Sequence, residues 1–250
     1  MELSKRLQAV ADLLDAHPCI ADIGCDHGFV SIYLIRSHKA KRCIAMDVNQ
    51  GPLERAAAHI KQEGLSTYIE TRLSDGAKAL NPPVLKEGGL KAEAQAALIA
   101  GMGGRLTIRI LQDSLEKFQA MEEVILQPQS EIWKVREFIE DQGWRILKED
   151  MILEEGKFYP MMKVLVKGAK GIPPHKKEAD GDLFYYYGEY LLKTKNKVLL
   201  NFLKNEKRLY ETILQNLQEN ETPKAKVRIE EIKEMLNRIE KGLEWFADEM

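Results

Sequence analysis

Short apolar runs alternate with amphipathic segments along the first 145 residues of the chain. Each run has the length of a buried strand, and the segments between the runs carry apolar residues at helical spacing. Buried strands separated by helices are typical of a parallel sheet covered on both faces. The predicted strands are Cys19–Ile23, Arg42–Asp47, Tyr68–Leu73, Ala96–Ala100 and Glu123–Gln127, and the predicted helices are Phe29–Lys39, Pro52–Glu63, Arg105–Phe118 and Ile132–Gln142.

A β-hairpin is predicted after Gly143, where the strand-like runs Ile146–Leu153 and Tyr159–Val166 flank a short polar turn. Residues 7–14 have the spacing of an amphipathic helix, which we expect to cover the sheet. Residues 81–95 carry glycines and charges and are expected to form a surface loop. Seven strands that end in a hairpin are the usual form of the Rossmann-like, class I S-adenosylmethionine-dependent methyltransferase sheet. The predicted fold class is therefore α/β.

The remainder of the chain predicts a separate helical domain. Residues 168–182 are rich in glycine, proline and charge and have the composition of a linker. Apolar residues then recur at steps of three, four and seven over residues 187–217 and 229–246, and Thr222–Pro223 supplies an N-cap and a first-turn proline. This pattern predicts an antiparallel, coiled-coil-like helical hairpin. The predicted domains are residues 1–167 and residues 168–250.

Composition limits the class of protein. The chain has 37 Lys and Arg residues against 39 Asp and Glu residues, which argues against a histone-like polycation but not against a local basic face. No run approaches 18 uncharged apolar residues, and the N-terminus lacks the apolar core of a signal peptide. Cys19, Cys25 and Cys43 lack the spacing of metal ligands and are expected to be reduced and buried. We expect a soluble cytoplasmic protein without a metal.

The loop after the first predicted strand carries the strongest functional signal. Asp22 and Gly24 end that strand, and the second strand ends in Asp47, at the distance expected of a ribose-binding acid. Asp26 stands within the loop and would repel the phosphates of a dinucleotide. The sulfonium cation of S-adenosylmethionine suits such a carboxylate, with Asp22 near the amino-acid end of the cofactor. The alternative is that Asp22 and Asp26 are turn residues that bond their own backbone.

Later loops add weaker signals. Ser74–Gly76 has an acid that can accept from the adenine amino group, although an ordinary turn has the same residues. Residues 101–104 contain three glycines that allow close approach of a ligand, or a tight turn. The amides of Gln127–Gln129 can read a base edge. Arg105 is the best candidate for a phosphate contact, and His27 is either catalytic or a structural hydrogen-bonding group.

Several segments together carry a likeness to one family: Leu3–Leu7, Ala21–His27, Ile99–Gly104, Leu126–Pro128, Ile152–Glu155 and the helical tail. The chain resembles the bacterial tRNA (adenine-22-N1)-methyltransferases, the TrmK family. The resemblance implies methyl transfer from S-adenosylmethionine to N1 of an adenine in the D-arm region of tRNA, with the hairpin assisting tRNA binding. It also implies that Asp26 takes part in catalysis.

The residues and the resemblance lead to one set of predicted site residues, with Asp26 as the catalytic residue. The predicted cofactor-binding residues are Asp22, Gly24, Cys25, His27, Gly28, Asp47, Asp75, Gly76, Gly101, Met102 and Gly103. The predicted substrate-binding residues are Arg6, Gly104, Arg105, Gln127 and Pro128.

Other functions remain compatible with the sequence. A methyltransferase of the same fold can act on another RNA, a protein or a small molecule. A nucleoside-binding adaptor can use the heptad helices to recruit a partner. We expect a monomer with tRNA as its partner, while the heptad spacing leaves a hairpin-mediated dimer open. A nicotinamide dehydrogenase ranks last because of Asp26.

Overall fold

The computed structural model describes residues 3–87, 89–167, 181–219 and 222–247. The chain divides into two compact units, Met1–Pro174 and His175–Met250. Most of the predicted linker, residues 168–180, lies outside the described residues.

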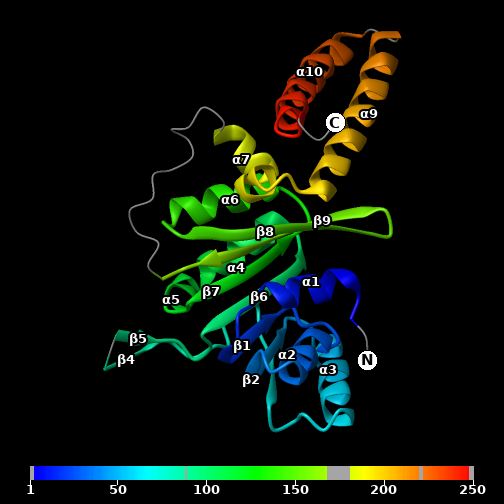
Figure 1. Ribbon diagram of the computed structural model, residues 1–250. Coiled ribbons are helices and arrows are strands. Elements are labelled where there is room, and N and C mark those ends of the chain that lie inside the picture. The colour runs from blue at the N-terminus through cyan, green and yellow to red at the C-terminus, as the bar shows by residue number, and fades with distance from the viewer. Residues whose placement is uncertain (1–2, 88, 168–180, 220–221, 248–250) are drawn as a thin grey trace. The chain divides into compact units, whose positions relative to one another are not determined.

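The first unit is built on a seven-stranded sheet in the order β3-β2-β1-β6-β7-β9-β8 (Figure 1). The first five strands in this order are mutually parallel, and β9 runs antiparallel to both β7 and β8. This is the predicted Rossmann-like α/β sheet, which the structure confirms. The strands are β1 (His17–Ile23), β2 (Ala40–Asp47), β3 (Ile69–Leu73), β6 (Ala96–Met102), β7 (Glu123–Pro128), β8 (Arg145–Glu154) and β9 (Lys157–Leu165).

Helices cover both faces of this sheet and enclose two hydrophobic cores. Side chains of α1 (Lys5–Leu13), α2 (Phe29–Arg36) and α3 (Gln50–Gln62) pack into one core. Side chains of α4 (Gly104–Asp113), α5 (Leu115–Gln119) and α6 (Ile132–Asp141) pack into the other. Alternate residues of a strand point to opposite faces, so β1 contributes Ile20 to the first core and Ala21 to the second.

The turn between β8 and β9 confirms the predicted hairpin. Glu155 and Gly156 have φ angles of 49° and 76°. Two consecutive residues at positive φ form the turn whose twist matches that of the flanking strands.

Two predictions for this unit were wrong in detail. The helix expected over Arg105–Phe118 is two helices, because Ser114 leaves the helical conformation (φ −135°) and its carbonyl starts α5 by accepting from Lys117 and Phe118. The loop expected at residues 81–95 contains a small two-stranded sheet, β4 (Val84–Lys86) and β5 (Gly89–Lys91).

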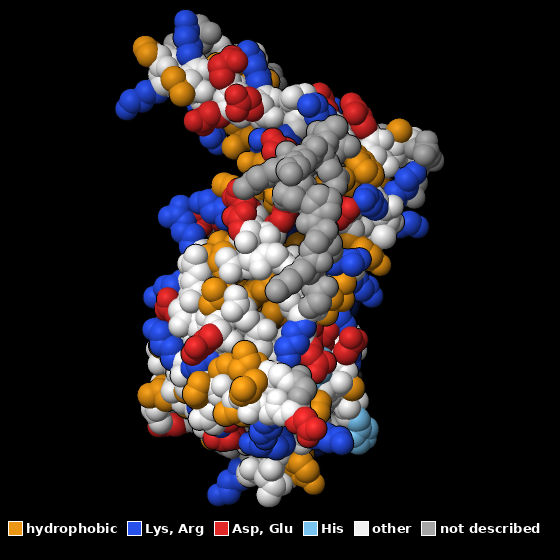
Figure 2. All heavy atoms as spheres, turned by 90° about the vertical axis from the view of Figure 1, so that its left-hand side faces the viewer, with side chains coloured by type: hydrophobic (Ala, Val, Ile, Leu, Met, Phe, Trp, Pro, Cys, Tyr) orange, Lys and Arg blue, Asp and Glu red, His pale blue; other side chains and the backbone are white. Residues whose placement is uncertain are grey.

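The β4–β5 hairpin lacks the burial that makes strands recognisable from a sequence. Leu85 faces Leu90 across the pair, and their side chains are 80% and 52% exposed. Figure 2 shows an orange patch in the lower half of its face, where this hairpin points toward the viewer. Its base is held by Glu93, whose carboxylate accepts from Arg72 and from Asn81.

The second unit consists of helices α7 (Gly181–Tyr187), α8 (Glu189–Lys193), α9 (Lys197–Glu219) and α10 (Pro223–Glu244). The first tail helix, expected to be continuous over residues 187–217, is interrupted at Gly188 (φ 90°) and Lys195 (φ 51°). The predicted start of the last helix is confirmed, since the Thr222 side chain accepts from the amide of Ala225. No helix in the described part of either unit is long and apolar enough to cross a bilayer.

Candidate active site

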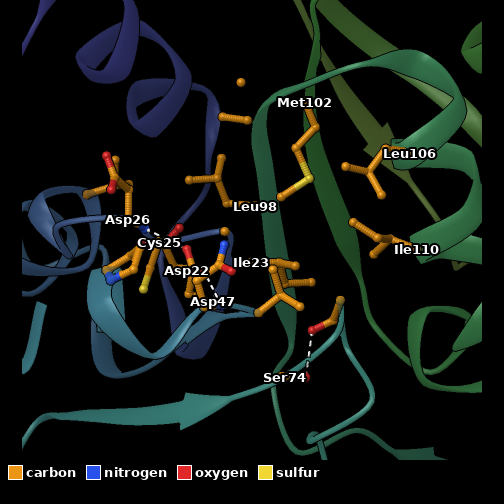
Figure 3. A pocket seen from close by; sticks show the side chains of 18 of the residues that line it. Asp22, Ile23, Cys25, Asp26, Asp47, Ser74, Leu98, Met102, Leu106 and Ile110 are labelled. Carbon is orange, nitrogen blue, oxygen red and sulfur yellow. Dashed lines mark hydrogen bonds between the residues drawn. The ribbon is translucent and has the colours of Figure 1, made fainter. Parts of the chain in front are cut away.

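A cavity of about 520 Å³ opens at the carboxyl edge of the sheet. It lies where the strand order reverses, between β1 and β6, which is the position at which open α/β sheets bind ligands. Figure 3 shows two facing walls. One wall carries Asp22, Asp26 and Asp47 from the ends of β1 and β2, and the other carries Leu106 and Ile110 from α4.

Every second residue of the loop after β1 has a positive φ angle. Gly24, Asp26 and Gly28 have φ angles of 78°, 48° and 73°. Asp26 therefore occupies a left-handed position that favours glycine, and aspartate is among the residues that tolerate it. The amides of Gly24 and Cys25 donate to the carbonyl of Met46, which fixes the loop to β2. This conformation presents the Asp26 carboxylate at the cavity with 68% of its side chain exposed.

Asp22 is the buried acid of the site, with only 3% of its surface exposed. The hydroxyl of Ser31 on α2 donates to its Oδ2 at 2.7 Å. Burial raises the pKa of Asp22 to about 6 and outweighs the opposing effect of the Ser31 hydrogen bond. The carboxyl can therefore change its charge within a mildly acidic range.

Asp47 ends β2 and faces the same wall. Its Oδ1 accepts from the amide of Asn49 at 2.9 Å, and its Oδ2 accepts from the amide of Asp26 at 3.3 Å. A carboxylate has about four acceptor positions, so both oxygens can still accept from a ligand. The two amides hold the Asp47 carboxylate at the cavity.

Asp75, predicted near an adenine, is already engaged by two cations. Lys78 Nζ lies 2.6 Å from one carboxylate oxygen, and Arg109 Nη2 lies 3.1 Å from the other. The Lys78 hydrogen bond is the main reason that the pKa of Asp75 is lowered. A ligand amino group would have to share this acid with both cations. Gly76 lies beside it at a φ of 62°, where a side chain would meet Ile110 at 3.0 Å.

Met102 crosses from the apolar wall to the glycine loop. A Cβ atom at Gly24 would lie 2.3 Å from the Met102 methyl group, so the two residues are in direct contact. Gly101, with a φ of 78°, also lines the cavity. The sequence predicts close approach at residues 101–104, and at Gly101 the nearest group is the Arg6 guanidinium, with Nη1 3.6 Å from the Cβ position.

Gln127 lies behind the cavity wall and is fully buried. Its Oε1 accepts from Arg6 Nη1 at 2.9 Å and from the amide of Gly101 at 3.1 Å. Gln127 therefore joins the first helix to the end of β6. Arg105 points away from the cavity lining, with 78% of its side chain exposed and its Nε 2.8 Å from Glu131.

The structure brings together most of the predicted residues. Eleven line the cavity: Arg6, Asp22, Gly24, Cys25, Asp26, His27, Asp47, Asp75, Gly76, Gly101 and Met102. Six do not: Gly28, Gly103, Gly104, Arg105, Gln127 and Pro128. Two of these six have a packing role. Gly28 begins α2 beside Ala56, and a Cβ at Gly104 would lie 2.4 Å from the carbonyl oxygen of Ser130.

Sequence reasoning missed several lining or supporting residues, chiefly on helices: Ser31, Leu106, Arg109 and Ile110. Ser31 and Ile110 lie on the helices that follow two of the cavity loops. Their positions in the helical pattern do not distinguish a cavity-facing residue from a core residue.

The donor set fits a cationic nucleoside cofactor. Four aspartates line the cavity, one of them buried, and this charge disfavours a diphosphate. The opposite wall offers the apolar side chains that flat or aliphatic ligand groups require.

Comparisons with known proteins agree with this geometry. Residues 20–241 match the family TrmK, tRNA (adenine(22)-N(1))-methyltransferase. The chain is 33% identical to the tRNA (adenine(22)-N(1))-methyltransferase of Bacillus subtilis (strain 168), over 96% of the chain and 95% of that relative. It is similar to the structure of Streptococcus pneumoniae Sp1610 in complex with S-adenosyl-L-methionine (TM-score 0.79, 27% identity), over 97% of this chain and 100% of that one. It is also similar to M. capricolum TrmK in complex with S-adenosyl-homocysteine (TM-score 0.80, 26% identity), over 98% and 99%. The chain therefore belongs to the TrmK family of tRNA (adenine(22)-N(1))-methyltransferases.

Proposed function

We propose that this protein transfers a methyl group from S-adenosylmethionine to N1 of adenine 22 in tRNA. The observation that carries the proposal is the acidic wall, in which the buried Asp22 lies beneath the glycine loop and Asp47 ends the next strand. Membership of the TrmK family supports the choice of tRNA and of the adenine.

The cavity residues fall into groups suited to different parts of the cofactor. Bound S-adenosylmethionine supplies a methyl group on a positively charged sulfur. Asp22 suits the ammonium of the amino-acid end, and Asp47 has acceptor positions left for the ribose hydroxyls. Leu106 and Ile110 give the opposite side an apolar surface.

Positioning is the main task of the chain in this reaction. Adenine N1 has an available lone pair, so neither a strong base nor a metal is needed. Holding two reactants in line can contribute about 7–11 kcal/mol in favourable cases. N1 faces inward in a paired adenine, so the base must be unpaired or flipped at a cost of a few kcal/mol.

Asp26 is the residue that we assign to catalysis. Methylation at N1 brings a positive charge onto the adenine ring. The exposed Asp26 carboxylate at the cavity can accept from the exocyclic amino group and stabilise that charge as it develops. His27 Nε2 lies 3.6 Å from Asp26 Oδ1 and can help to orient it.

The reaction is tested by incubating the protein with methyl-labelled S-adenosylmethionine and unmodified tRNA transcripts. We expect label in tRNAs that carry an adenine at position 22, and a reverse-transcriptase stop at that nucleotide. Replacing this adenine by guanine in the same transcript should abolish the stop. Absence of label from every tRNA would leave another substrate or a non-catalytic role.

Asp26→Asn tests the catalytic assignment, because asparagine also tolerates a positive φ and removes only the charge. We expect kcat to fall by about 100-fold, in the range of one lost electrostatic contact, with the affinities for cofactor and tRNA retained. Full turnover by this variant would exclude Asp26 from catalysis. Asp113→Asn, at the exposed end of α4, is the matched control.

We further propose that the enzyme works as a monomer in the cytoplasm. The three cysteines are free and buried, as expected of a protein in a reducing compartment. Light scattering of the purified chain tests the monomer, and a concentration-dependent dimer would contradict it.

A further inference from the structure

Arg6 contributes to the cavity a positive charge that has no acidic side-chain partner among the described residues. Its Nη1 donates to the Gln127 amide oxygen, and its guanidinium carbon lies 5.3 Å from the ring centre of Tyr159. Both partners are neutral. The Glu154 carboxylate accepts from the backbone amide of Arg6 at 3.4 Å. Among the described residues it forms no hydrogen bond or ion pair with the Arg6 guanidinium. The charge is thus held in place without being compensated, as expected of an anion-binding side chain.

The other arginine of the lining is in a different state. Arg109 is paired with Asp75, which also holds Lys78. Four aspartates and two arginines line the cavity, and one of these arginines is already neutralised. Among the lining residues, Arg6 is therefore the group best able to receive an anion.

Gln127 fixes the direction of this charge. The Arg6 guanidinium and the Gly101 amide both donate to the same atom of the Gln127 side-chain amide. Because both groups are donors, this atom is the oxygen, Oε1, and not the nitrogen. The buried Nε2 has no hydrogen-bond partner among the described residues. A buried donor without a partner is costly, which makes this arrangement unusual for a purely structural glutamine.

We propose that Arg6 binds the α-carboxylate of S-adenosylmethionine and that Gln127 is its positioning residue; this inference rests on the proposed function. The amino-acid end of the cofactor carries both an ammonium and a carboxylate at neutral pH. The acidic wall attracts the ammonium and the sulfonium but repels the carboxylate. Arg6 Nη1 lies 3.6 Å from the Cβ position of Gly101, and both residues line the cavity together with Met102 and Gly24. Arg6 there supplies the missing counter-charge.

Calorimetry with two ligands tests the proposal. S-adenosylmethionine carries the carboxylate, and decarboxylated S-adenosylmethionine lacks only that group. We expect Arg6→Gln to weaken binding of the first ligand by about 10- to 100-fold, the worth of a hydrogen bond to a charged group. Binding of the decarboxylated ligand should change less than threefold, and Arg6→Lys should restore part of the lost affinity.

Two further variants separate this role from a general loss of structure. Lys5→Gln removes a charge from the exposed neighbouring position on the same helix and should leave both affinities unchanged. Gln127→Leu keeps the Arg6 charge but removes the hydrogen bond that orients it. The difference in affinity between the two ligands should therefore become smaller, even if the variant is less stable.

The outcomes distinguish the possible roles of Arg6. Equal losses for both ligands would overturn the proposal, as would an Arg6→Gln variant that loses only tRNA affinity, which would make Arg6 a phosphate contact. If the wild-type chain bound neither ligand, the proposed function itself would fail.

Discussion

Gly24 and Gly64 share a left-handed backbone but differ in their surroundings. Both have φ near 75°, with values of 78° and 71°. A Cβ at Gly24 would meet the Met102 methyl at 2.3 Å, whereas a Cβ at Gly64 would meet nothing within 4 Å. Substitutions at these two glycines therefore distinguish the effect of backbone strain from the effect of a new contact inside the cavity.

Alanine substitution at these two glycines gives a prediction. Gly64→Ala should cost about 1–2 kcal/mol of unfolding free energy, the cost of a left-handed residue with a side chain, and leave the affinity for S-adenosylmethionine unchanged. Gly24→Ala should carry a similar cost and in addition weaken cofactor binding by at least tenfold, because the methyl group enters the cavity. Urea unfolding and calorimetry measure the two effects. Equal cofactor affinity in both variants would contradict this assignment.

The buried acid predicts a pH-dependent affinity. Asp22 has a pKa of about 6 in the free protein, and a neighbouring ammonium would favour its charged form. Below pH 6 the carboxyl must lose a proton when the cofactor binds, so affinity should fall with falling pH by at most tenfold per unit. Titrations between pH 5.0 and 6.8 test this, since neither charged group of the amino-acid end titrates strongly in that range. Asp22→Asn should bind more weakly and with a flat profile, and a flat profile in the wild type would count against the ammonium contact.

For single residues, the sequence predicted the chemical type of the site better than the direction in which each side chain points. Asp22, Asp26 and Asp47 follow from loop motifs, because the ends of neighbouring parallel strands meet at one edge of the sheet. Gln127 was expected to read a base, but it is buried behind the wall, since only packing decides whether an amide faces a cavity or a neighbouring helix.

Elements were predictable where burial imposed a pattern. The seven strands of the main sheet each pair with a neighbour, most of them carry apolar runs, and all were predicted close to their observed bounds. The exposed strands β4 and β5 carry no such run. The breaks at Gly188 and Lys195 were missed because the apolar spacing continues across them.

Asn196 caps the helix that follows the second of these breaks. Its Oδ1 accepts from the amides of Val198 and Leu199 at 2.9 and 3.0 Å. Asn196→Ala should therefore destabilise α9 by about 1 kcal/mol, seen as a fall of about 2–4 °C in the thermal unfolding of the full chain. Asn205→Ala, the same substitution at an exposed position within α9, should be neutral or slightly stabilising. Equal effects at the two positions would exclude the capping role.

The first unit as a whole contains an ionic cluster at the opposite edge of the sheet from the cavity. Glu123, which begins β7, accepts from His17 at 3.1 Å and from Lys163 at 2.9 Å. The Glu123 hydrogen bond raises the pKa of His17 despite its burial. Burial alone would raise the pKa of Glu123, but His17 and Lys163 outweigh it and the pKa is lowered.

These shifts predict how stability changes with pH. A raised histidine pKa stabilises the fold fully below the ordinary value of about 6.5, and this contribution is lost as pH rises through the folded-state value. The Glu123 contribution is present above about pH 4.5 and is lost as pH falls. The difference in unfolding free energy between wild type and His17→Gln should therefore be largest between about pH 5 and 6.5. It should shrink toward pH 8 by at most about 1.4 kcal/mol per unit.

Urea unfolding at several pH values measures this difference, with His38→Asn as a control at an exposed histidine of positive φ. The control should show no such slope. A difference that stays constant from pH 5 to pH 8 would mean that His17 does not stabilise the fold through its charge.

The acidic wall also has a consequence for turnover. The methyl donor enters the cavity with a positive sulfur and leaves it as a neutral thioether, while the aspartates remain. The same carboxylates that attract the fresh donor therefore hold the spent one less tightly. The charge of the cavity therefore favours the replacement of the spent cofactor by a fresh one.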